Sequence, residues 1–189
     1  GDNYRPTIHL VLHGGPGKIY NGDLGKILGT LDAREKAAAP YPLRIECPVI
    51  QETRESQIET LATLREYIAF RKLQVEIVAD EWANTLDDIQ AFLSGSAADM
   101  IQIKMPDLGS LEDIIEAVRI CRSCGVKTFL GGSCAETSLS SRITAQLALA
   151  VQPDLVLAKP GMGIDEAVAL MQNEMSRELA WLKQKSKQQ

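Results

Sequence analysis

The sequence lacks the features that mark several large classes of protein. No apolar run comes near the roughly 20 residues that a membrane-spanning helix needs, and the first residues, GDNYRP, lack the basic and apolar regions of a signal peptide. The net charge is −5, and no cluster of lysine and arginine precedes the tail KQKSKQQ, which we interpret as a fraying helix end. We therefore expect a cytoplasmic protein that binds neither membranes nor nucleic acid.

The cysteine spacing typical of a disulfide-bonded secreted protein is also missing. The four cysteines, Cys47, Cys121, Cys124 and Cys134, show no disulfide framework, which fits reduced thiols inside the cell. Cys121 and Cys124 form a C-x-x-C, but they close an amphipathic stretch and no second pair accompanies them. Zinc and redox chemistry are therefore not favoured.

What the chain does contain is an ordinary globular composition, with 45% hydrophobic and 24% charged residues. Short β-forming runs alternate with amphipathic stretches. The pattern predicts strands at 7–12, 43–46, 74–80, 99–104, 127–132 and 154–158. It predicts helices at 23–39, 54–72, 85–94, 110–124, 137–150 and 164–185, the last capped by Asp165. This strict alternation predicts parallel strands joined by helices, in one domain over residues 1–189.

Two architectures accept this alternation, the open doubly wound sheet and the closed (β/α)8 barrel. Side chains alternate faces along a strand, and three successive strands show one apolar face and one face that becomes polar at its carboxyl end. The polar members are Arg44 with Glu46, Glu76 with Asp80, and Gln102 with Lys104. A doubly wound sheet should be apolar on both faces, so a barrel is favoured. A full barrel has eight strands in about 250 residues, which leaves this chain two strands short.

Glu46, Asp80 and Lys104 end three consecutive strands, where barrel enzymes carry their catalytic groups. Two converging carboxylates repel each other unless a divalent cation lies between them, and oxygen ligands favour Mg²⁺ or Mn²⁺. A partly buried lysine near that cation should have a lowered pKa and act as a general base. The pattern indicates proton abstraction next to a carboxylate, as in enolase-type sites. The alternative is that Glu46 and Asp80 each pair with a neighbouring arginine.

Two loops and one histidine are further candidates. In GGSCAET, glycines precede Ser133, Cys134 and Thr137, so backbone N–H groups there could hold an anionic group. A tight turn with a Ser or Thr helix cap explains the same residues. The loop AKPGMG after the last strand carries Lys159, which we interpret as a solvated charge, and His13 follows the first strand.

The segments LRIECP, VADEWANT, QIKMPDLGS, LGGSCAET and LAKPGMGIDEAVALMQNEMSR resemble methylaspartate ammonia-lyases, a family of the enolase superfamily, over nearly the whole chain. The resemblance implies the superfamily's (β/α) TIM-type barrel, incomplete here and corresponding to the C-terminal part of a longer family chain. It implies a carbon-nitrogen lyase that reversibly eliminates ammonia from 3-methylaspartate to give mesaconate. It also implies Mg²⁺, often with K⁺ as an activator, a small amino-acid substrate and a homodimer.

The same resemblance assigns roles to individual positions. The family's metal-binding glutamate and aspartate match Glu46 and Asp80, and its lysine base matches Lys104. Its substrate contacts match four further positions, which are Gln102, Ser133, Cys134 and Leu157.

Two departures from the family pattern leave two readings open. A third metal carboxylate of the family falls on Val11, which cannot bind a cation, so the affinity for Mg²⁺ should be lower. The family's N-terminal domain and two barrel strands also have no counterpart in this chain. The chain is either a lyase of this type or a non-catalytic homologue that acts by association. A racemase or cycloisomerase would carry a K-x-K pair, which is missing. Open strand edges predict self-association or pairing with a chain that carries the remaining part.

Overall fold

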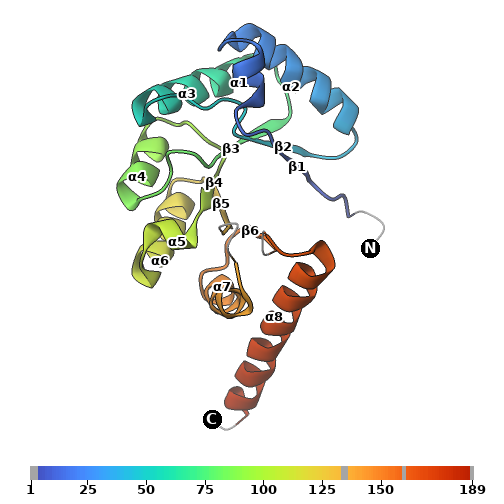
Figure 1. Cartoon of the computed structure of the whole chain (residues 1–189), viewed down its shortest axis with the longest axis vertical. Helices are drawn as coiled ribbons and strands as arrows, with labels where there is room; N and C mark the ends of the chain where they lie inside the picture. Colours follow the sequence, from blue (N-terminus) through green and yellow to red (C-terminus); the bar gives the residue numbers. More distant parts are fainter. Residues whose placement is uncertain (1–3, 133–135, 159–160, 188–189) are drawn as a thin grey trace. The chain divides into compact units, whose positions relative to one another are not determined.

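The computed structural model describes residues 4–132, 136–158 and 161–187. These residues form two compact units. Unit 1 holds the described residues of 1–101 and 124–126, and unit 2 holds those of 102–123 and 127–189. Across the described ranges, six strands alternate with helices and are hydrogen-bonded to one another in chain order, from β1 to β6 (Figure 1). Chain-order pairing of strands separated by helices is the connectivity of a (β/α) barrel.

Unit 1 begins with three strands and the start of a fourth. The strands are β1 (Ile8–Val11), β2 (Leu43–Glu46), β3 (Val75–Ala79) and β4 (Met100–Ile103). The helices between them are α1 (Gly15–Ile19), α2 (Leu24–Ala38), α3 (Arg54–Phe70) and α4 (Leu86–Ser94). The strands pair in parallel, and the register sets Val11 opposite Glu46 and Glu46 opposite Val78. The carboxyl ends of β1 and β2 are therefore level.

Local sequence signals explain where the helices of unit 1 begin. The side chain of Asp23 accepts the Lys26 N–H at the start of α2, and Thr53 does the same for α3. Thr85 and Asp88 form a reciprocal capping box at the start of α4. The helices and the sheet bury apolar side chains between them. The fully buried ones include Ile45 and Ile77 on strands and Ile27, Leu31, Leu61, Leu64, Ile89 and Phe92 on helices. Each such side chain contributes roughly 1.5–3 kcal/mol of hydrophobic stabilisation.

An aspartate fixes the register of β3 against β4. The Asp99 backbone N–H donates to the Ile77 carbonyl at 2.9 Å, and the Ile77 N–H donates back to the Asp99 carboxylate at 2.8 Å. Arg65 of α3 donates to the same carboxylate and pairs with it at 2.5 Å. The carboxylate thus ties two strands and a helix together at the amino end of β4.

Unit 2 contains the end of β4 and the remaining elements. These are α5 (Met105–Leu108), α6 (Leu111–Ser123), β5 (Lys127–Leu130), α7 (Ser138–Val151), β6 (Leu155–Val156) and α8 (Ile164–Ser186). Strands β5 and β6 are parallel. Asp154 repeats the arrangement seen at Asp99, because its carboxylate accepts the Thr128 N–H at 2.8 Å and its own N–H donates to the Thr128 carbonyl at 3.0 Å. Ser110 and Thr137 cap α6 and α7.

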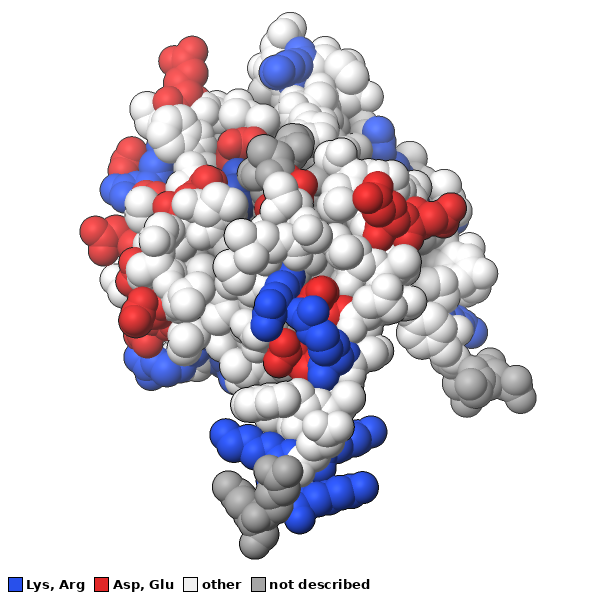
Figure 2. All heavy atoms as spheres, turned by 60° about the horizontal axis from the view of Figure 1, so that its bottom comes forward, with Lys and Arg blue, Asp and Glu red and all other residues white. Residues whose placement is uncertain are grey.

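The prediction of six strands and six long helices is confirmed. Two short helices, α1 and α5, were not predicted, and β4 ends one residue earlier than expected, at Ile103. The predicted cap Asp165 is wrong, since Gly163 holds the N-cap position of α8 and Asp165 lies in its first turn. The tail does continue this helix, and basic side chains gather around its carboxyl end (Figure 2). The assignment of residues 1–189 to a single domain stays a prediction.

No helix in the described ranges combines the length and apolar character that crossing a bilayer requires.

Candidate active site

Glu46 ends β2 and is almost completely buried, with 4% of its surface exposed. Its carboxylate lies 2.8 Å from the Nε2 atom of His9, which is on β1. Arg44, two residues earlier on the same strand, instead pairs with Glu76 of β3 at 2.7 Å. The alternative in which Glu46 pairs with a neighbouring arginine is therefore wrong, since within the described residues its carboxylate is hydrogen-bonded to His9 and Arg44 pairs with Glu76.

Asp80 follows β3 directly and is 8% exposed. Its carbonyl accepts the Ala83 N–H at 3.2 Å, which turns the chain immediately after the aspartate. The Trp82 indole N–H donates to the carbonyl of Gln51 at 3.0 Å, so the loop after β3 is tied to the loop after β2. The buried side chain of Gln57 supports the second loop, because it donates to the Val49 carbonyl at 3.1 Å and accepts the Gln51 N–H at 2.8 Å. The loops that follow Glu46 and Asp80 are thus both braced within unit 1.

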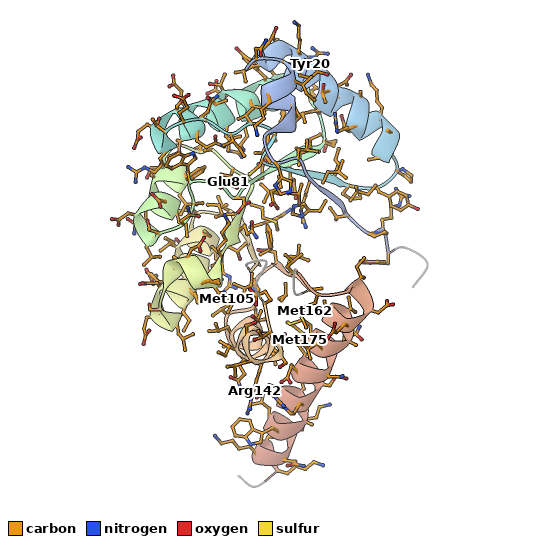
Figure 3. The ribbon with its side chains drawn as sticks, viewed as in Figure 1. Tyr20, Glu81, Met105, Arg142, Met162 and Met175 are labelled. Carbon is orange, nitrogen blue, oxygen red and sulfur yellow. The ribbon has the colours of Figure 1, made fainter. Side chains whose placement is uncertain are left out.

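The Cys47 thiol reports the electrostatic character of this edge of unit 1. Burial raises the pKa of Cys47 to about 12, and a hydrogen bond to the backbone of Glu81 lowers it. The negative charges of Asp80, Glu46 and Glu81 raise the pKa further. Glu81 is the residue after Asp80, in the loop between β3 and α4 (Figure 3). The edge therefore has a negative potential that favours a cation.

The donor set suits Mg²⁺, though with fewer protein ligands than the family pattern implies. Glu46 and Asp80 are buried carboxylates that follow adjacent strands, and Mg²⁺ commonly takes one or two carboxylates and completes its shell with water and substrate. Val11 lies opposite Glu46 in the sheet register and has no ligand atom. Within the residues that the structure describes, no three His, Cys, Asp or Glu side chains are placed to hold a metal ion together. The residues present fit a cation held by two carboxylates.

Lys104 belongs to unit 2, where it joins β4 to the short helix α5. It is half-buried and holds the N-cap position of α5, with its carbonyl accepting the N–H groups of Asp107 at 3.1 Å and Leu108 at 3.3 Å. Pro106 is the second residue of this helix, and Gly109 follows its last residue with a φ of 77°, a conformation that glycine adopts without strain. The motif KMPDLG therefore fixes the backbone from which the Lys104 side chain extends.

Gln102 lies two residues before Lys104 on β4 and is 6% exposed. Its Oε1 atom is buried and accepts no hydrogen bond from the described part of the chain. A buried acceptor without a donor is unfavourable by about 1–3 kcal/mol, so this atom is suited to a donor that a ligand brings.

The other predicted positions are less defined. Leu157 follows β6 and is 37% exposed, with its N–H donating to the Leu130 carbonyl at 2.9 Å. Ser133, Cys134 and Lys159 lie outside the described residues. His13 is exposed and has a positive φ of 47°, in the turn between β1 and α1.

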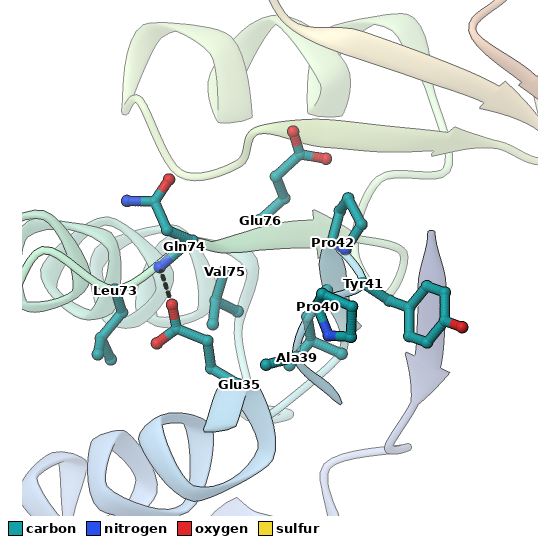
Figure 4. Close-up of a pocket in the computed structure, with 10 residues that line it drawn as sticks. Glu35, Ala39, Pro40, Tyr41, Pro42, Leu73, Gln74, Val75 and Glu76 are labelled. Carbon is teal, nitrogen blue, oxygen red and sulfur yellow. Dashed lines mark hydrogen bonds between the residues drawn. The ribbon is translucent and has the colours of Figure 1, made fainter. Parts of the chain in front are cut away.

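A hollow of about 490 Å³ lies at the opposite end of the strands in unit 1 (Figure 4). It is lined by the starts of β2 and β3 and by the end of α2, where Glu35 accepts the Gln74 N–H at 2.7 Å. The predicted catalytic residues follow the carboxyl ends of strands, whereas the amino ends of barrel strands generally serve stability. We therefore do not assign this hollow to the site.

Sequence reasoning missed the residues that brace the site. Trp82 and Gly131 act through contacts between segments distant in the chain, and Gln57 acts through contacts with the loop just before its own helix. Neither periodicity nor spacing reveals such contacts. His9 lies two residues before Val11 on β1, and alternation along one strand gives no sign that Glu46 on the next strand is its partner.

Comparison with known proteins places the chain in a family. The family model for the methylaspartate ammonia-lyase C-terminus matches residues 1–184. Methylaspartate ammonia-lyase 2 of Carboxydothermus hydrogenoformans is 49% identical over 185 residues, which cover 98% of this chain and 45% of that protein. The chain thus spans less than half the length of that curated relative.

Solved structures agree with this assignment. The Citrobacter amalonaticus methylaspartate ammonia-lyase that contains (2S,3S)-3-methylaspartic acid has a TM-score of 0.92 at 38% identity, covering 97% of this chain and 44% of that one. The Mg-complex of β-methylaspartase from Clostridium tetanomorphum has a TM-score of 0.90 at 37% identity, covering 98% of this chain and 45% of that one. A more distant structure, at 23% identity, shares the fold alone. The predicted (β/α) barrel fold is confirmed, and the chain belongs to the methylaspartate ammonia-lyase family, whose C-terminal part it matches.

Proposed function

We propose that this chain carries the proton-abstracting part of an ammonia-lyase that acts on 3-methylaspartate. The base takes the proton on C3, which is α to a carboxylate; the C2–N bond breaks and a C2–C3 double bond forms. The products are mesaconate and ammonia. The observation that carries the proposal is the family match over residues 1–184, since the relatives named above are methylaspartate ammonia-lyases.

Lys104 is the proposed base. It directly follows a buried strand, and a four-residue helix holds its backbone, so the point from which its side chain extends is fixed. A general base contributes most when its geometry is set before the substrate binds. Gln102 is the proposed substrate contact on the same strand, because its amide is buried and its Oε1 atom accepts no hydrogen bond from the described residues. Ser133, Cys134 and Leu157 are proposed as further contacts on the strength of the family resemblance.

Glu46 and Asp80 are the proposed ligands of Mg²⁺, with K⁺ as an activator by family resemblance. The solved relative from Clostridium tetanomorphum is a Mg-complex, which supports the choice of metal. A bound Mg²⁺ would stabilise the negative charge that develops on the substrate carboxylate as the proton leaves. His9 holds the Glu46 carboxylate in one orientation, and the Trp82 and Gln51 contact braces the loop that carries Asp80.

The test is release of ammonia and mesaconate from 3-methylaspartate in the presence of Mg²⁺. Lys104→Ala should lower kcat by roughly 10²–10⁴-fold, the contribution of a positioned base. Lys26→Ala is the matched control, because Lys26 is an exposed lysine on α2, and it should retain the wild-type rate. Full activity of Lys104→Ala would show that another group is the base.

A second candidate function is a non-catalytic subunit that acts by association. Val11 favours it, since this residue lies opposite Glu46 at the position where the resemblance implies a third carboxylate. Such a subunit should bind Mg²⁺ weakly, and neither Glu46→Gln nor Asp80→Asn should change that weak affinity. Calorimetry that detects tight Mg²⁺ binding by the wild-type chain, lost in both variants, would rule this candidate out.

A further inference from the structure

Gly131 follows β5 and lies directly against the side chain of Gln102 on β4, the neighbouring strand in Figure 1. A Cβ atom on residue 131 would lie 2.2 Å from Nε2 of Gln102 and 2.9 Å from both its Cδ and Cγ atoms. Real Cβ atoms do not approach other heavy atoms so closely. Because the conflict extends along the side chain to Cγ, rotation of the terminal amide alone would not relieve it.

Both partners in this contact lie in the interior. Gln102 is buried, and Gly131 is buried as well. The Gly131 N–H donates to the Ile103 carbonyl at 3.1 Å, which fixes the spacing between the two backbones. Gly131 is not among the glycines with positive φ, so its backbone conformation is open to any residue. What glycine supplies here is the missing Cβ.

The space left by the missing Cβ atom of Gly131 is filled by the Gln102 amide. The Oε1 atom of this amide is buried and accepts no hydrogen bond from the described residues. We propose that Gly131 is a positioning residue, whose bare backbone holds the Gln102 amide in the orientation that contacts the substrate. This inference rests on the proposed function, because it takes Gln102 as a substrate contact. A bulkier residue at 131 would turn the amide away while leaving Lys104 in place.

The next residue provides a matched control. A Cβ atom on Gly132 would lie 2.2 Å from the Oε1 atom and 2.8 Å from the Cδ atom of Glu136, but 3.3 Å from its Cγ atom, so the conflict is confined to the far end of that side chain. Glu136 is half-buried and its carboxylate accepts a hydrogen bond from the Ser140 hydroxyl, so displacing the carboxylate costs a partly exposed contact and no buried packing. Gly132 is not among the glycines with positive φ either. The same substitution at adjacent positions should therefore have different consequences.

The first experiment measures thermal unfolding of the full chain in a double-mutant cycle. Gly131→Ala should lower Tm by roughly 4 °C or more, as overpacking of a buried site does, and Gly132→Ala by about 1 °C or less. In the Gln102→Ala background, Gly131→Ala should lower Tm by no more than about 1 °C, because the atoms in conflict are gone. An equal loss in both backgrounds would overturn the contact and the proposal with it.

The second experiment measures KM and kcat for 3-methylaspartate. Gly131→Ala should raise KM by about tenfold or more with a smaller change in kcat, as loss of a binding contact does. Gly29→Ala, at an exposed position of α2 where a Cβ atom meets nothing within 4 Å, should leave both unchanged. Gln102→Ala should give the same KM as the Gly131→Ala, Gln102→Ala double variant. An unchanged KM in an active Gly131→Ala enzyme would overturn the positioning role. Absence of turnover in the wild type would instead overturn the proposed function, and the positioning role with it, while the unfolding cycle would still report the contact.

Discussion

Val11 is the residue at which this chain departs from the ligand set that its family resemblance implies. It ends β1, lies opposite Glu46 in the parallel register and is 44% exposed. Val11→Asp should add a carboxylate near Glu46 and raise the affinity for Mg²⁺ by about tenfold or more, because an added charged ligand strengthens a hard-cation site. Titration calorimetry with Mg²⁺ measures the change.

Val11→Asn is the control for Val11→Asp, since asparagine has nearly the shape of aspartate but no negative charge. It should bind Mg²⁺ about as weakly as the wild type. If the aspartate and asparagine variants bind with the same affinity, Val11 does not occupy a ligand position.

Cys47 gives a second prediction at the residue scale. Its thiol pKa is raised by burial, and by neighbouring carboxylates, from 9.0 to about 12. In the unfolded chain the thiol ionises near pH 9, whereas in the folded chain it stays protonated until about pH 12. Ionisation of this thiol therefore leaves stability unchanged below pH 9, and stability falls as the pH rises from 9 toward 12, because only the unfolded chain then carries the thiolate. Urea unfolding of wild type and Cys47→Ala should show a steeper alkaline loss of stability in the wild type. Parallel pH profiles would contradict this account.

At the scale of the elements, an aspartate just before β4 and another just before β6 each accept a backbone N–H from the neighbouring strand, but within the described residues only the first also binds an arginine. Asp99 accepts the Ile77 N–H and also pairs with Arg65, whereas Asp154 accepts the Thr128 N–H at an exposed position. Asp99→Ala should lower the free energy of unfolding by about 2 kcal/mol and Asp154→Ala by about 1 kcal/mol, since Asp99 loses its contact with Arg65 as well as the link between strands. Denaturant unfolding measures both.

Asp99→Asn separates the two contributions at the stronger site. It keeps an acceptor for the Ile77 N–H but loses the charge that Arg65 binds, so its stability should lie between wild type and Asp99→Ala. A stability equal to that of Asp99→Ala would mean that the ion pair, and not the link between strands, carries the effect.

The elements that sequence patterns predicted correctly are those with a long repeating signal. The 17-residue helix α3 shows amphipathic periodicity and a threonine cap, and both can be read along the chain. Helices α1 and α5 are five and four residues long, too short for any periodicity, and only Pro16 and Pro106 hint at their starts. Asp165 suggested a cap, but an acidic residue in the first turn stabilises a helix equally well.

The candidate site was predictable in part for the same reason. Alternation along each strand set Arg44 and Glu76 on one face, and their ion pair at 2.7 Å confirms that parity. The predicted strand bounds placed Glu46 and Asp80 at carboxyl ends. The contacts that hold them involve His9, Gln51 and Trp82, which lie on other segments and which no pattern along one strand reveals. The metal and substrate roles of these residues stay predictions.

At the scale of the whole molecule, the chain spans about 45% of the length of its Carboxydothermus relative, and in the described residues β1 and β6 each have one neighbouring strand. Open strand edges present N–H and C=O groups that pair readily with another chain. We propose that the edge of β1 is such a surface, for a second copy or for a chain that carries the remaining barrel strands.

The backbone at Val11 tests this proposal. The N–H groups of Ile8 and Leu12 donate to the Pro42 and Glu46 carbonyls on the side of β2. Because donors alternate along a strand, the N–H of Val11 is directed toward the open edge. Proline at an edge position removes that donor without breaking the pairing on the other side. Val11→Pro should therefore weaken association, whereas Val11→Ala keeps the donor and should associate as the wild type does.

Sedimentation equilibrium of the three chains over a range of concentrations measures the effect. The wild type and Val11→Ala should show a mass above 20.7 kDa that rises with concentration. Val11→Pro should need about tenfold or more higher concentration to reach the same mass, since one lost hydrogen bond and a blocked edge act together. Circular dichroism must show that the proline variant keeps its helical content, because unfolding would also change association. A wild-type chain that sediments as a monomer at every concentration would rule out self-association, and the edge would then be available only to a different chain.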